Sequence, residues 1–82
     1  MRIIGTIPHP VLKITVFQLS MKFAIKFEVG MMEQTYKIRE SDLIAKLSDI
    51  NNLVDEKFTE QVLEQFKEMA EVLGGAFKRA SE

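Results

Sequence analysis

One pairing register sorts the side chains of residues 13–39 onto two faces, and no other feature constrains the fold as much. Reversals at Ser20–Met21 and at Gly30–Met31 place the apolar side chains on one face of three antiparallel strands. A slip of one residue would move all of them to the opposite face, so the pattern predicts a three-stranded β-meander. The apolar face carries Ile14, Val16, Phe23, Ile25, Phe27, Tyr36 and Ile38.

The opposite face of the predicted meander is mostly charged and is expected to meet water. Lys13 lies across from Glu28 in this register, which adds a little stability. Ser20–Met21 is not a favoured two-residue hairpin turn, so a longer first loop is the alternative. This face carries Lys13, Thr15, Phe17, Leu19, Lys22, Lys26, Glu28, Glu33, Thr35, Lys37 and Arg39.

From Asp55 onward the apolar residues recur at spacings of three and four, which predicts an amphipathic helix. Gly74–Gly75 is expected to end this helix or to interrupt it, because two glycines cost about 2 kcal/mol relative to alanine. Between the sheet and the helix, Ser41 and Asp49 are expected to cap short helical turns. The apolar stripe consists of Phe58, Val62, Phe66, Met69, Leu73 and Phe77, and opposite it stand Glu56, Glu60, Glu64 and Glu68.

These elements predict an α+β fold, with a three- or four-stranded antiparallel β-meander and one long C-terminal amphipathic helix packed on one face. Residues 1–82 are expected to form a single domain, with Arg2–Thr6 as the additional strand. The helix is expected to run from about Asp55 to Leu73. The expected core is Ile14, Val16, Phe23, Ile25, Phe27, Tyr36, Ile38, Phe58, Val62, Phe66, Met69 and Leu73.

The residue types that are scarce in this chain argue against several kinds of chemistry. It has no cysteine and one histidine, so it lacks the usual nitrogen and sulfur ligands of a zinc site. Its four glycines do not form a phosphate-binding loop, and the four glutamates of the helix are expected to face water. We therefore expect no metal and no cofactor. No apolar run approaches the roughly 20 residues of a membrane span, and the chain is expected to be cytoplasmic.

His9 stands between Pro8 and Pro10 in the segment TIPHP. No serine lies in a Gly-x-Ser-x-Gly motif that would complete a catalytic triad, so an enzyme centred on His9 ranks last among the functions. Each proline holds the residue before it in an extended conformation, so the segment is predicted to be a rigid lead-in to the first main strand. Whether it also presents His9 to a partner is left open.

The charge is divided unevenly along the chain and points to surface interactions. Residues 1–40 carry six Lys/Arg against three Glu, whereas residues 41–82 carry five against nine Asp/Glu. The leading hypothesis is a small non-enzymatic interaction or accessory protein that forms a homodimer. The candidate contacts are the Phe17–Leu19 corner, the Met31–Met32 turn, an open strand edge, the helix end around Phe77, and the acidic helix ridge against the basic sheet face of a second copy. The alternative is a weak binder of single-stranded nucleic acid that uses the basic sheet face. The candidate surface residues are His9, Phe17, Leu19, Lys22, Lys26, Lys37, Arg39 and Phe77.

The strings IPHPVLKITVF, KFAIKFEVG and EQTYKI resemble a group of short uncharacterised bacterial proteins. Those proteins share a Pro-His-Pro lead-in, a β-meander and one C-terminal helix. The resemblance implies the same arrangement here, and it implies no activity, cofactor or catalytic residue.

Overall fold

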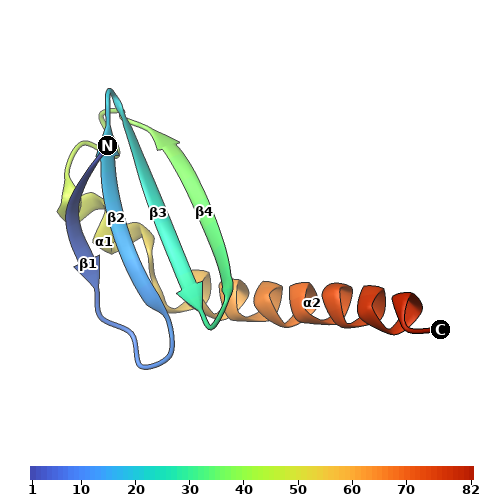
Figure 1. Ribbon diagram of the computed structural model, residues 1–82. Coiled ribbons are helices and arrows are strands. Elements are labelled where there is room, and N and C mark those ends of the chain that lie inside the picture. Colours follow the sequence, from blue (N-terminus) through green and yellow to red (C-terminus); the bar gives the residue numbers. More distant parts are fainter.

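The computed structural model describes all 82 residues and shows an antiparallel sheet followed by two helices (Figure 1). The four strands are β1 (Arg2–Ile7), β2 (Lys13–Leu19), β3 (Lys22–Val29) and β4 (Met32–Arg39), and they lie in the sheet in sequence order. The helices are α1 (Leu47–Leu53) and α2 (Glu56–Ala80). The α+β meander is confirmed, and β1 is its fourth strand.

The register that sorts the two faces is the one the structure adopts. Val16 pairs with Ile25 and Ile14 with Phe27, and both hairpins close with two-residue turns. The alternative of a longer first loop is wrong, because Met21 adopts the left-handed conformation that the turn needs, with φ of 57°. Gly30 takes φ of 58° at the first position of the second turn, where glycine is unstrained. The stability gained by placing apolar and charged side chains on separate faces of the sheet outweighs the cost of an unfavourable residue in the first turn.

The core lies between one face of the sheet and the two helices. Several buried residues come from the loops and from the short helix α1, which the sheet and helix periodicities did not single out. These side chains close the ends of the core where the chain passes from one element to the next. They are Leu12, Ile44, Ile50 and Val54.

Two residues expected in the core lie outside it. The side chain of Tyr36 is on the core face, but β4 is the edge strand and leaves it 38% exposed. Leu73 belongs to the apolar stripe of α2, yet it is 55% exposed because the helix has already passed the edge of the sheet. Periodicity identifies a face of an element, whereas burial depends on whether a neighbour reaches it.

The expected helical turns between the sheet and α2 were partly wrong. Ser41 does accept a hydrogen bond from the Ile44 amide, at 3.2 Å, but the chain there forms a bend rather than a helix. Asp49 does not precede a helix: it lies within α1, and its carboxylate accepts hydrogen bonds from the amides of Ala45, at 2.9 Å, and Lys46, at 3.1 Å. Asp49 therefore provides a hydrogen-bond acceptor for two backbone amides at the start of α1, although it lies inside the first turn of that helix.

The helix α2 is longer than expected and leaves the body of the domain. Asp55 caps its start by accepting a hydrogen bond from the Phe58 amide at 2.9 Å. The expected end at Gly74–Gly75 is wrong, because the helix continues to Ala80. Beyond Met69 every side chain is exposed, and Figure 1 shows this part projecting past β4. We call residues 70–80 the α2 extension.

Candidate interaction surfaces

The imidazole of His9 is used locally, in the loop between β1 and β2. Its Nδ1 accepts hydrogen bonds from the amides of Val11, at 3.1 Å, and Leu12, at 3.0 Å. Leu12 is buried in the core, so these bonds help to hold the loop where its side chain enters the core. The ring is half-buried, and its Nδ1 lone pair already has two donors.

Replacing His9 by alanine is expected to lower the free energy of unfolding by about 1 kcal/mol, because two amides lose their acceptor. His9→Asn is the matched control, since an asparagine side-chain oxygen accepts from amides two residues further on. We expect the asparagine variant to retain most of the stability in urea unfolding. Equal losses for the two variants would show that the acceptor is not what matters.

Four of the expected surface residues meet on the open face of the sheet, opposite the helices. Phe17, Leu19, Lys26 and Lys37 line a hollow of about 210 Å³ together with Met1, Ala24, Glu33 and Thr35. The ammonium of Lys26 lies 3.2 Å from the Glu33 carboxylate and 3.9 Å from that of Glu28. The positive charge of Lys26 is thus balanced within the chain, which weakens the basic character of this face.

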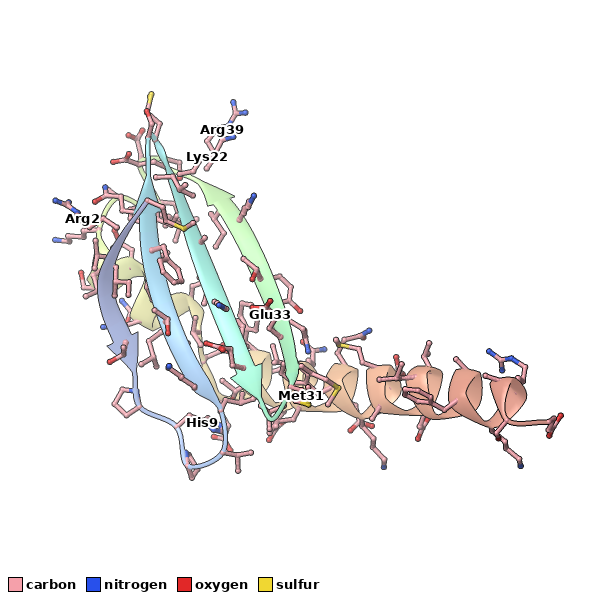
Figure 2. The ribbon with its side chains drawn as sticks, viewed as in Figure 1. Arg2, His9, Lys22, Met31, Glu33 and Arg39 are labelled. Carbon is pink, nitrogen blue, oxygen red and sulfur yellow. The ribbon has the colours of Figure 1, made fainter.

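Charge is segregated along β3 and β4 on the same open face, as Figure 2 shows. At one end Lys22 lies directly opposite Arg39, and near the other end Glu28 lies directly opposite Glu33. Like charges that face each other across strands are destabilising. The sequence register already contains both pairs, and this signal could have been found before the structure.

The expected site residue Phe77 lies far from the sheet, on the α2 extension. Val72, Leu73 and Phe77 are 73%, 55% and 67% exposed there. Leu73 and Phe77 continue the stripe that Val62 and Phe66 bury against the sheet. Residues Gln65, Glu68, Met69, Val72, Leu73 and Ala76 surround a hollow of about 330 Å³ on this helix.

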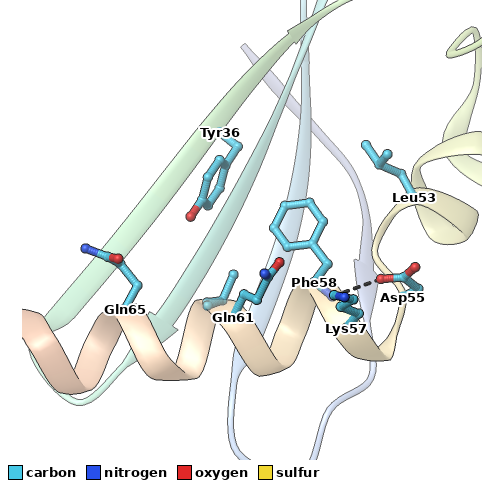
Figure 3. A pocket seen from close by; sticks show the side chains of 8 residues that line it. Tyr36, Leu53, Asp55, Lys57, Phe58, Gln61 and Gln65 are labelled. Atoms are coloured by element: carbon cyan, nitrogen blue, oxygen red, sulfur yellow. Dashed lines mark hydrogen bonds between the residues drawn. The ribbon is translucent and has the colours of Figure 1, made fainter.

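A groove that the sequence did not predict lies between β4, the first half of α2 and the end of α1 (Figure 3). It has a volume of about 450 Å³, and Tyr36, Leu53 and Phe58 are its apolar wall, with Val62. The ring of Tyr36 meets the rings of Phe27 and Phe58 edge-on, at centroid distances of 5.7 and 5.3 Å. Its remaining lining residues are Asp55, Lys57, Gln61 and Gln65.

The two edges of the sheet differ. β4 pairs with β3 over all eight of its residues without a bulge, whereas the pairing of β1 with β2 shifts register between Ile3 and Gly5. Bulges are one of the devices that protect an edge from pairing with another chain. The β4 edge therefore remains a straight strand that can accept a further strand.

Comparison with known proteins gives no family model, no curated protein and no solved structure that matches this chain. No group of three or more His, Cys, Asp or Glu side chains is placed to hold a metal ion. Neither helix has the length and apolar character needed to cross a bilayer.

Proposed function

We propose that this chain is a small non-enzymatic interaction protein that self-associates as a homodimer and acts through its surface. The observation that carries the proposal is the α2 extension, whose apolar stripe continues the one that forms the core. The stripe is buried at Val62 and Phe66 and exposed at Leu73 and Phe77. One half of the stripe is therefore exposed to water. A contiguous exposed apolar surface of this kind is typical of a site that a partner covers.

The energetics of the α2 extension support a covering partner. The extension, residues 70–80, continues a helix that is already nucleated on the sheet, but its own exposed side chains gain no packing in the single chain. Gly74 and Gly75 add a cost of about 2 kcal/mol relative to alanine. Full burial of an apolar side chain the size of leucine contributes about 1.5–3 kcal/mol, so covering Leu73 and Phe77 more than offsets the glycines.

The charges at the two ends of α2 support a second copy as that partner. The start of α2 carries Asp55 and Glu56 beside Lys57, a net charge of −1, and the last turn carries Lys78 and Arg79. Two α2 helices in antiparallel orientation bring the basic end of each toward the acidic end of the other. This complementarity favours self-association over pairing with a uniformly charged partner.

The role of His9 supports a function without catalysis, because its Nδ1 accepts two backbone hydrogen bonds in the loop it stabilises. We place the protein in the cytoplasm, since the chain has no cysteine and needs no oxidising compartment.

Sedimentation velocity over a range of protein concentrations tests the proposal. We expect a monomer at low concentration and a dimer at high concentration, with one reversible transition between them. Sedimentation as a monomer at the highest concentration, at low salt, would contradict self-association. Purification from native cells then shows whether the dimer carries a further protein.

Binding of single-stranded nucleic acid through the basic face of the sheet is a second candidate, and the pair of Lys22 and Arg39 at one end of that face favours it (Figure 2). Fluorescence anisotropy with labelled oligonucleotides separates this function from self-association. Binding through these residues must weaken steeply with salt. No change in anisotropy at low salt would dismiss it.

A further inference from the structure

We infer that two copies pair along β4 in antiparallel orientation, with Tyr36 opposite Tyr36 of the second copy. The two sheets then join into one continuous sheet, and each α2 extension lies against the groove of the other copy. This inference rests on the proposed self-association and specifies how the copies meet. Three features carry it: the β4 edge, the charges and the groove.

The β4 edge supplies the backbone contacts. An edge strand presents unpaired N–H and C=O groups, and a second strand can satisfy them. β4 is eight residues long, has no bulge and contains no proline. Self-pairing through a two-fold axis uses the same edge of both copies, which closes the assembly at a dimer.

The charges of β3 and β4 fit an antiparallel partner better than they fit the single chain. Pairing centred on Tyr36 places Glu33 of each copy opposite Arg39 of the other, on the open face. The acidic end of one strand pair thus meets the basic end of the other. Within one chain Arg39 faces Lys22, and Glu33 faces Glu28 with Lys26 3.2 Å from the Glu33 carboxylate. The second copy gives Arg39 an acidic partner, which it lacks in its own chain, and gives Glu33 a second basic one.

The charge at Arg39 selects Tyr36 as the centre. A continuous sheet keeps both open faces on the same side, so residues that lie opposite each other in the new strand pair must share a face. The two-fold axis therefore passes a residue that pairs with its own copy, and Thr35 and Tyr36 are the residues nearest the middle of β4. The side-chain amide of Gln34 donates to the Val62 carbonyl at 3.0 Å and marks where α2 passes β4.

With Thr35 at the centre, Glu33 lies opposite Lys37 of the second copy and Arg39 lies opposite Met31, so Arg39 still lacks an acidic partner. With Tyr36 at the centre, both Glu33 and Arg39 face a residue of opposite charge. The charges therefore favour the Tyr36 register.

The groove and the α2 extension complement each other in this arrangement. Figure 1 shows α2 leaving the domain on the side of β4, where the second copy lies. The stripe of the extension points the same way as Phe66, toward the layer that the second sheet occupies. Because the two α2 helices are antiparallel, each extension runs toward the start of the other, where Leu53 and Phe58 line the groove. Its Lys78 and Arg79 approach the acidic start of that helix.

Single-cysteine crosslinking tests the geometry, and the natural chain offers a clean background because it has no cysteine. Residues opposite each other in an antiparallel pair have Cα atoms about 4.5–5.5 Å apart, within the range of a disulfide. We expect Tyr36→Cys to form a disulfide-linked dimer on mild oxidation. Thr35→Cys, which marks the rejected register, and Thr6→Cys, on the opposite edge strand, are expected to remain monomeric on a non-reducing gel.

A charge exchange provides a second test that does not disturb Tyr36. Arg39→Glu faces Lys22 within its own chain, so it is expected to fold normally while it brings two carboxylates together in the dimer. We expect the dimer Kd to rise about tenfold at low salt, since the contact occurs twice. Adding Glu33→Lys removes the Lys26–Glu33 ion pair but leaves Glu28 facing the new lysine and beside Lys26, and it is expected to restore the original Kd.

The outcomes separate this inference from the proposed function. Crosslinking at position 36 together with rescue by the double exchange supports the β4 dimer. A dimer in sedimentation that crosslinks at position 35 or 6 instead overturns the β4 geometry but not self-association. The same holds for a dimer whose Kd is unchanged by Arg39→Glu and by the double exchange. A chain that sediments as a monomer overturns both.

Discussion

Replacing Leu73 and Phe77 together by glutamine is expected to yield a folded monomer, with a dimer Kd at least about a hundredfold higher. Both side chains are largely exposed in the single chain, so the domain itself loses little. In the dimer each of them is buried once per copy, and burial contributes about 1.5–3 kcal/mol per side chain. Sedimentation equilibrium measures the Kd, and far-UV circular dichroism confirms the fold.

The matched control for this variant is the pair Glu64→Gln and Glu71→Gln. It introduces the same two side chains into the same helix, on the face opposite the stripe, where both residues are exposed. We expect the control to dimerise within a few-fold of the unmodified chain. If both double variants weaken the dimer equally, the effect belongs to helix propensity or charge and the stripe is not the contact.

Phe27→Ala is expected to lower the free energy of unfolding by about 3–5 kcal/mol, which is the range for truncating a buried phenylalanine. Phe27 is fully buried, and its ring lies 5.3 Å from that of Phe58 and 5.7 Å from that of Tyr36. It therefore joins β3 to both β4 and α2. A domain of this length has a total stability of about 4–12 kcal/mol, so this single change removes a large part of it.

Phe17→Ala is the control for Phe27→Ala, because it truncates the same residue type on the open face of the sheet, where Phe17 is half-buried. We expect a loss of about 1 kcal/mol, and urea unfolding measures both variants. The comparison belongs in the Leu73→Gln and Phe77→Gln background, since dimerisation adds a concentration-dependent contribution to stability. Similar losses at the two positions would mean that the core is not where the structure places it.

The sheet could be predicted in detail because its information is local and repeated. A side-chain period of two, maintained from Lys13 to Arg39, admits one register that buries Ile14, Ile25 and Phe27 together. Even Met21, a poor residue for a left-handed turn, did not alter that register. The helix was predicted for the same reason, although its end at Gly74–Gly75 was wrong, because about 2 kcal/mol of glycine cost does not by itself stop a helix that is already nucleated.

The candidate surfaces were less predictable because they depend on where elements end relative to one another. The like-charge pair of Lys22 and Arg39 follows from the register and needs no structure. The groove beside Tyr36 does not, because it requires β4 to be the edge strand and α1 to end beside α2. Leu73 shows the same distinction: its face of the helix was predicted, but its exposure was not.

The sequence by itself determined the strand register, the face that each side chain occupies and the apolar stripe of α2, since these follow from periods of two and 3.6 residues within single elements. Only the tertiary structure decided which parts of those faces are covered. The sheet is four strands wide and α2 is longer than that width, so the helix runs past β4 and carries its stripe into solvent. Packing between elements is a property of their lengths and placement, and periodicity within an element does not record it.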